Sequence, residues 1–232
     1  MKLGIYGDSY AAINNPSSQH FSWPKLISAH YPTIIFSLRG SNFFYSYEKL
    51  LKTYSYVDQC ILILTNPSRI KINNSINLNP YSLQFAHSIR SENDFKQVND
   101  PMAIEALKAT DYYYKYIYDY NFMHEVQHSL VERLLAKIPN LLVIPAFPNS
   151  YSRDSFKINS VSTSLFDISI AEINHWKIKN LYPDARECHL SIENNVILKD
   201  IVLENLGRGI IELDKTRFNL TPEYKEWYCV NN

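Results

Sequence analysis

The amino-acid sequence predicts an α/β fold in which a parallel β-sheet carries helices on both faces. Short apolar segments of strand length alternate along the chain with longer segments whose apolar residues recur at helical spacing. The strand-like segments are apolar at nearly every position, which is typical of strands buried on both faces. We therefore expect a flavodoxin-like three-layer α/β/α sandwich.

Four segments are predicted to form the strands of this sheet. They lie at residues 2–6, 33–38, 60–64 and 141–144. The first three are followed by residues that are common in turns, namely Gly7-Asp8-Ser9, Arg39-Gly40-Ser41 and Thr65-Asn66-Pro67. Because the carboxyl ends of parallel strands share one edge of a sheet, these turns are expected to meet there.

Helices are expected between these strands and after the last of them. They are placed at residues 23–30, 45–54, 101–137 with a break near Asn121, and 192–206. Pro24 suits a first helical turn, and Ser191 suits an N-cap. The last helix is expected to stop at Gly207. Its apolar residues with a 3.6-residue period are Val196, Ile197, Ile201, Val202 and Leu206.

The length of 232 residues fits one domain with insertions. Residues 67–100 and 148–180 are polar and are interpreted as two insertions that would shape a substrate pocket, the second with a helix at 168–175. Residues 207–232 mix aromatic and charged side chains without a clear period, so they are interpreted as a C-terminal extension.

Charge and composition exclude several classes of partner. The chain has 23 basic and 23 acidic residues, so it lacks the basic excess that displaces counterions from nucleic acid. No apolar segment has the length of a signal-peptide core or a membrane span. Cys60, Cys188 and Cys229 are odd in number and far apart, which is typical of reduced thiols. We expect a cytoplasmic protein that binds neither nucleic acid nor membranes.

Residues that could take part in catalysis follow the predicted strands and precede the last helix. Ser9 follows the first strand, Gly40 the second and Asn66 the third, and His189 lies just before the last helix. In order and position these residues resemble the four blocks of the SGNH (GDSL-type) hydrolase family, which contribute Ser, Gly, Asn and His. The resemblance covers residues 1 to about 206, and it rests on the order of the four blocks, since each motif alone is short.

The resemblance implies a serine esterase that needs no cofactor. Ser9 is then the nucleophile, and His189 is the base that takes its proton. The oxyanion hole consists of the backbone N–H groups of Ser9 and Gly40 and the side-chain amide of Asn66. The substrate is expected to be a small-molecule or carbohydrate ester, such as an acetylated carbohydrate.

Two departures from the family pattern leave alternatives open. The third block is usually Gly-x-Asn-Asp, and only Asn66 remains of it here. The family places its acid three residues before the histidine, where this chain has Arg186. Asp184 is the preferred acid, and Glu187 is the second candidate. The third alternative is a Ser-His dyad without an acid. The alternative function is a catalytically inactive SGNH-like module for binding or assembly, of cellular or viral origin.

A second motif is that of a zinc metallohydrolase. Residues 124–128 read His-Glu-Val-Gln-His and match H-E-x-x-H, which on a helix places two histidines on one face with a glutamate as base. Zinc needs a third ligand, and the candidates Glu172 and His175 lie in no motif. We favour an exposed amphipathic helix in which His124 and His128 fall four residues apart, so no metal is expected.

Two further features have simple explanations. Cys188 stands beside His189, but adjacent residues on a turn rarely present their side chains to each other, so a thiol nucleophile is not expected. Six tyrosines could stack on a carbohydrate, but we favour packing of their helix against the sheet and its insertions, with the hydroxyls reaching water. These tyrosines are Tyr112, Tyr113, Tyr114, Tyr116, Tyr118 and Tyr120.

Overall fold

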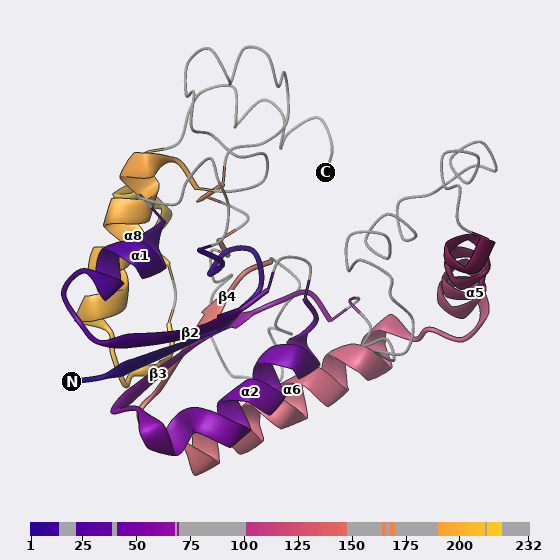
Figure 1. Cartoon of the computed structure of the whole chain (residues 1–232), viewed down its shortest axis with the longest axis horizontal. Coiled ribbons are helices and arrows are strands. Elements are labelled where there is room, and N and C mark those ends of the chain that lie inside the picture. The colour runs from indigo at the N-terminus through magenta and orange to yellow at the C-terminus, as the bar shows by residue number, and fades with distance from the viewer. Residues whose placement is uncertain are drawn as a thin grey trace.

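The computed structural model describes most of the predicted core. The described residues are 1–13, 22–38, 41–67, 69, 101–147, 164–165, 168–169, 190–211 and 213–219. They contain a five-stranded sheet in which every pair of neighbouring strands is parallel (Figure 1). The strand order β2-β1-β3-β4-β5 is that of flavodoxin-like doubly wound sheets. The predicted α/β class with a parallel sheet is confirmed.

The elements agree closely with the predicted segments. The strands are β1 (Leu3–Gly7), β2 (Thr33–Ser37), β3 (Gln59–Leu64), β4 (Leu141–Pro145) and β5 (Gly209–Ile210). The α-helices are α1 (Trp23–Ser28), α2 (Phe43–Thr53), α5 (Pro101–Tyr116), α6 (Tyr120–Lys137) and α8 (Ile192–Glu204). Two 3-10 helices are η1 (Tyr54–Tyr56) and η3 (Lys215–Arg217). Three short elements were not expected, because such short elements show no period: η1, which follows α2, and β5 and η3, which fall in the predicted extension.

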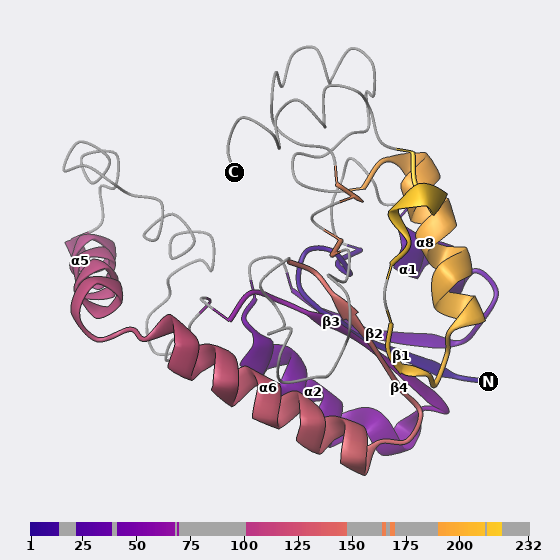
Figure 2. The ribbon, with the colours of Figure 1, turned by 180° about the vertical axis from the view of Figure 1, so that it is seen from behind.

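Side chains alternate along the strands between two buried layers. In β1, Leu3 and Ile5 pack in the layer that contains α1 and α8, whereas Tyr6 packs in the layer that contains α2 and α6. In β3, Ile61 and Leu62 divide in the same way. Figures 1 and 2 show α1 and α8 on one face of the sheet and α2 and α6 on the other. Both faces of the central strands β1, β3 and β4 are thus removed from water, which is the main source of the stability of the sheet.

The helical region predicted at 101–137 consists of two helices. Asp119 is the N-cap of α6, and its carboxylate accepts a hydrogen bond from the N–H of Phe122 at 3.0 Å. The break therefore falls just before α6, and Asn121 lies inside the helix. An N-cap carboxylate sets this boundary because it satisfies a backbone donor that the first turn leaves open.

The tyrosines of residues 112–120 do not pack against the sheet as predicted. Tyr112 and Tyr116 are 58% and 69% exposed, and Figures 1 and 2 show α5 lying apart from the sheet. Tyr114 and Tyr118 contact each other, with ring centroids 5.0 Å apart. The predicted packing against the sheet is wrong because consecutive tyrosines point to several sides of the helix, so a single buried face could not hold them. The predicted packing against the insertions concerns residues outside the described ranges.

The predicted start of α8 is confirmed, its end at Glu204 lies two residues before the predicted one, and one residue of its apolar face is corrected. Ser191 caps the helix by accepting the N–H of Asn194 at 3.2 Å. Gly207 follows the helix with a φ of 74°, which favours glycine. Val196, predicted to be buried, is 40% exposed, and Leu198 is buried instead. Apolar residues cover more than one side of this helix, so their spacing alone did not identify the buried side.

Several predictions concern residues outside the described ranges. Of the two predicted insertions, the structure describes Pro67, Arg69, residues 164–165 and residues 168–169, so the helix expected at 168–175 is not tested. Cys60 is a free, buried thiol. Among the described helices, none combines the length and apolarity needed to cross a membrane.

Two titratable side chains are buried between the sheet and the helices α2 and α6. The hydroxyl of Tyr6 lies 2.8 Å from the hydroxyl of Thr53 in α2. Burial raises the pKa of Tyr6 from 10.0 to about 12, and burial raises the pKa of Cys60 from 9.0 to about 11. Each group ionises at a lower pH in the unfolded chain, so alkaline pH favours unfolding.

We predict that the free energy of unfolding holds up to about pH 9 and falls as the pH rises through 11 and 12, where the folded protein loses these protons. Tyr6→Phe removes one of the two groups and should flatten this decrease above pH 10. Urea unfolding at a series of pH values measures the slope. Tyr56→Phe, at a tyrosine 67% exposed, is the control and should keep the wild-type slope. Equal slopes for the two variants would contradict the prediction.

Candidate functional site

The carboxyl ends of β1 and β3 lie side by side at the centre of the sheet. β1 pairs with β2 on one side and with β3 on the other. The next described helix after β1 is α1, which lies on one face, whereas α6 after β3 lies on the opposite face (Figure 1). Parallel α/β sheets bind ligands at such a switch point, because a crevice opens where the two connections diverge. Ser9 and Asn66 each lie two residues beyond the end of one of these strands.

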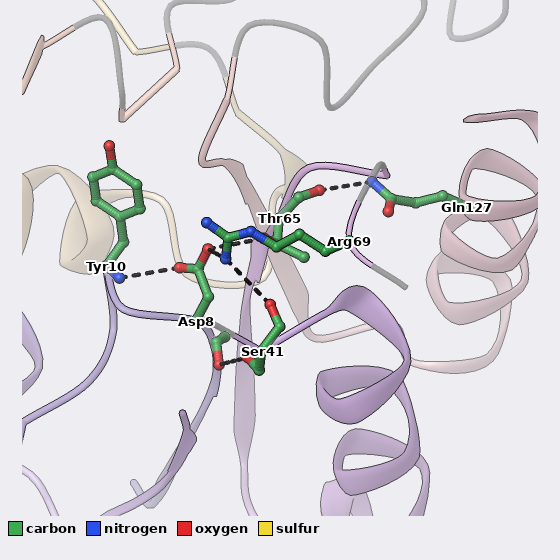
Figure 3. A network of polar contacts seen from close by, with 7 residues as sticks. Asp8, Tyr10, Ser41, Thr65, Arg69 and Gln127 are labelled. Atoms are coloured by element: carbon green, nitrogen blue, oxygen red, sulfur yellow. Dashed lines mark hydrogen bonds and ion pairs between the residues drawn. The ribbon is translucent and has the colours of Figure 1, made fainter. Parts of the chain in front are cut away.

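Asp8, the residue before Ser9, is the centre of a buried polar network (Figure 3). Its side chain is 0% exposed. One carboxylate oxygen accepts the N–H of Tyr10 at 3.0 Å, and the other accepts the hydroxyl of Thr65 at 2.9 Å and Nη1 of Arg69 at 2.8 Å. These donors replace the water that the carboxylate loses on burial. Asp8 therefore connects the turn after β1 to the segment after β3.

Arg69 connects this network to two further loops. Its Nη1 also donates to the backbone carbonyl of Ser41, after β2, at 3.2 Å. Its guanidinium lies over the ring of Phe147, after β4, with Cζ 4.9 Å from the ring centroid. The hydroxyl of Ser41 donates in turn to the carbonyl of Gly7 at 3.2 Å. The loops after β1, β2, β3 and β4 are thus held together by one guanidinium group and its partners.

Helix α6 contributes a buried amide to the same edge. Nε2 of Gln127, a residue 3% exposed, donates to the backbone carbonyl of Thr65 at 3.0 Å (Figure 3). Thr65 is therefore held through both its carbonyl and its hydroxyl, and it precedes Asn66. The sequence prediction missed Gln127 and Arg69. Gln127 does share a helical spacing with the buried residues Val131 and Leu134, and that spacing could have placed it on the inner face of α6.

Ser9 lies in a tight turn and is partly exposed. The turn is closed by a hydrogen bond from the N–H of Ala11 to the carbonyl of Asp8 at 3.1 Å. The hydrogen bonds among the described residues do not use the Ser9 hydroxyl. The first described helix after this turn is α1, and its N-cap is Ser22, so Asp8 does not cap it. The turn therefore has a fixed backbone and presents a hydroxyl that the network does not use.

The start of α8, which follows His189 in the sequence, is linked to the residue after Ser9. The carbonyl of Tyr10 accepts the indole N–H of Trp23 at 2.8 Å, and the backbone N–H of Trp23 donates to Oδ1 of Asn195 at 2.9 Å. Nδ2 of Asn195 donates to the carbonyl of Leu190 at 3.2 Å. Leu190 and Tyr10 also belong to the same hydrophobic cluster.

The predicted site residues therefore fall into two groups. Ser9 and Asn66 lie at the same edge of the sheet, beyond neighbouring strands. Gly40, Asp184, Glu187 and His189 lie outside the described residues, as do Arg186 and Cys188. The roles predicted for this second group stay predictions.

The H-E-x-x-H segment lies in α6, but its histidines are not exposed as predicted. His124 and His128 are each 8% exposed, whereas Glu125 is exposed. Nε2 of His128 lies 3.7 Å from the carboxylate of Glu132. The prediction is wrong because the histidines share the face of α6 that carries Gln127 toward the sheet edge. Within the described ranges, no three His, Cys, Asp or Glu side chains form a group that could hold a metal ion.

Comparisons of the chain with protein-family models, with curated proteins and with solved structures gave no match. The fold and the sheet edge therefore define the class of protein. It is an α/β protein whose described residues form a five-stranded parallel sheet, and the switch point of this sheet carries a serine and a buried aspartate paired with a partly buried arginine.

We predict that the contributions of Asp8 and Arg69 to the free energy of unfolding depend strongly on each other. Asp8→Asn or Arg69→Met alone should lower the free energy of unfolding by about 3–5 kcal/mol, because either change leaves the partner's charge buried without compensation. The decrease in the free energy of unfolding for the double variant should be clearly smaller than the sum of the decreases for the two single variants. Urea unfolding followed by circular dichroism measures all four proteins. The exposed pair Glu204 and Arg217 is the control, and its single variants should have much smaller effects. Additive losses at Asp8 and Arg69 would show that the two charges act independently.

Proposed function

We propose that this protein is a serine hydrolase of the SGNH type, which cleaves an ester through an acyl-enzyme formed on Ser9. The observation that supports the proposal is the environment of Ser9. The residue lies at the switch point of the sheet in a turn fixed by the buried carboxylate of Asp8. Its hydroxyl takes no part in the hydrogen bonds among the described residues. A nucleophile needs this combination of a fixed backbone and an available hydroxyl.

In the proposed mechanism, His189 takes the proton of Ser9 as the hydroxyl oxygen attacks the ester carbonyl. The hydrogen bonds that run from Tyr10 through Trp23 and Asn195 to Leu190 support this pairing, because they connect the residues that follow Ser9 and His189 in the chain. Asp184 is proposed to orient the imidazole, with Glu187 as the second candidate.

The oxyanion of the tetrahedral intermediate is proposed to bind the N–H groups of Ser9 and Gly40 and the amide of Asn66. The double anchoring of Thr65, by Gln127 and by Asp8, supports the role of Asn66, because donors held in place need no reorganisation during the reaction. Collapse of the intermediate releases the alcohol, which receives its proton from His189. A water deprotonated by His189 then cleaves the acyl-enzyme and restores Ser9.

The proposed substrate is a small-molecule or carbohydrate ester, including an acetylated carbohydrate. The second candidate function is a catalytically inactive SGNH-like module for binding or assembly. It is favoured by Arg186, which stands where the family has its acid, and by the altered block around Asn66.

We predict that a fluorophosphonate probe labels Ser9 and that the protein turns over a short-chain aryl ester. Ser9→Ala should abolish both without loss of folded structure, because the network around Asp8 does not use the Ser9 hydroxyl. The control is Ser129→Ala, an exposed serine of α6, which should react as the wild type does. Peptide mass spectrometry identifies the labelled residue. Folded wild-type protein that neither reacts nor turns over the ester would favour the binding module.

Asn66→Ala should lower kcat by about 100- to 1000-fold with little change in KM, because an oxyanion donor acts mainly in the transition state. Steady-state kinetics on the same aryl ester measures both constants. Asn121→Ala, at an exposed asparagine of α6, is the matched control. A kcat for Asn66→Ala within a few fold of the wild type would remove Asn66 from the oxyanion hole.

A further inference from the structure

Arg69 uses only one of its guanidinium nitrogens in the network around Asp8. Nη1 donates to both the carboxylate of Asp8 and the carbonyl of Ser41, at 2.8 Å and 3.2 Å. The hydrogen bonds among the described residues use neither Nε nor Nη2. In Figure 3 the second terminal nitrogen lies on the side of the guanidinium away from Ser41. One edge of the guanidinium therefore keeps N–H donors that these residues do not use.

The contacts of Arg69 fix this edge in place. The guanidinium is in contact with Asp8, with Ser41 and with the ring of Phe147, and the side chain is 12% exposed. Most of the conformational freedom of the side chain is thus lost before any ligand binds, which lowers the cost of binding. The planar guanidinium offers parallel N–H groups that match the oxygens of a carboxylate or a phosphate.

The geometry of the ion pair is unlike that of an arginine whose sole task is to neutralise an aspartate. Such pairs frequently use two nitrogens in a bidentate arrangement. Here a single nitrogen contacts Asp8, and Tyr10 and Thr65 donate the other hydrogen bonds to the carboxylate. The negative charge of Asp8 is thereby shared among three donors, and part of the binding capacity of Arg69 is kept for another partner.

We propose that Arg69 binds an anionic group of the substrate, so that the natural substrate is an ester carrying a carboxylate or a phosphate near the bond that Ser9 attacks. Ser9 directly follows Asp8, whose carboxylate contacts Arg69. An anion bound to Nε and Nη2 of Arg69 would therefore lie close to an ester bound at Ser9. This substrate class rests on the proposed function of Ser9 as the nucleophile.

The first test compares two acetyl esters of nearly equal shape. 4-Acetoxybenzoate carries a carboxylate, and 4-acetoxybenzamide is its neutral counterpart. We expect the wild-type protein to have a kcat/KM about tenfold or more higher for the acidic ester, because a hydrogen-bonded charge pair at Arg69 adds to its binding. In Arg69→Lys, which keeps a positive charge beside Asp8 but loses the planar fork, this ratio should fall toward one. The control is Arg208→Lys, at an exposed arginine, which should keep the wild-type ratio.

The second test detects the anion without turnover. Benzoate, phenyl phosphate and neutral benzamide are titrated into the full-length wild-type protein, and the Nε–H signal of Arg69 is followed by nuclear magnetic resonance. Arg69→Lys identifies the signal by its loss. We expect the anions to shift the signal and to slow labelling of Ser9 by fluorophosphonate, and benzamide to do neither. The larger effect of benzoate or of phenyl phosphate shows which anion the site prefers.

The outcomes separate this proposal from the proposed function. Turnover of both esters at equal kcat/KM, with an unchanged Arg69 signal, would overturn the anion site and leave the hydrolase intact. An anion-dependent Arg69 signal in a protein that cleaves no ester and is not labelled at Ser9 would keep the anion site and overturn the hydrolase. If Arg69→Lys does not fold, the wild-type ester preference and the effect of the anions on the wild-type spectrum decide the matter.

Discussion

A carboxylate removed from water must receive its hydrogen bonds from the chain itself, and the edge of this sheet is organised around that constraint. Asp8 lies at the end of β1 with no exposure, and its donors come from the turn after β1 and from the segment after β3. An uncompensated buried charge costs several kcal/mol, so the donors have to be present together. Ser9 directly follows Asp8 and Asn66 directly follows Thr65, so the network fixes the backbone next to both residues.

The hydrophobic layers support the network from both faces of the sheet. The layer with α1 and α8 supplies Trp23 and Asn195, which are hydrogen-bonded to each other, and Trp23 also binds the turn that contains Ser9. The layer with α6 supplies Gln127, which binds the carbonyl of Thr65. Burial of apolar side chains positions these helices, and polar side chains on the helices then form hydrogen bonds at the edge of the sheet. The site is therefore a product of the packing of both layers.

The strands and most helix ends could be predicted, because the apolar runs of β1, β3 and β4 and the cap at Ser191 are local signals. Resemblance to a family pointed to Ser9 and Asn66. Helical spacing could have placed Gln127 on the inner face of α6, but the hydrogen-bond partners of Arg69 and Gln127 could not be predicted in this way. Arg69 lies in a polar segment 61 residues from Asp8, and Gln127 lies 62 residues from Thr65, so their roles arise from tertiary contacts. The burial of His124 and His128 was missed for the same reason, since it depends on what α6 packs against.

The hydrogen bond between Trp23 and Asn195 joins residues 172 positions apart, and it lies on the path from the Ser9 turn to the start of α8. Contacts of such long sequence separation form late, because a large loop must close before they add stability. During synthesis the ribosome must therefore complete α8 before the turn after β1 gains its last support. Until then the backbone N–H of Trp23 lacks its partner on α8, so the turn that contains Ser9 receives its final support only after α8 has been synthesised.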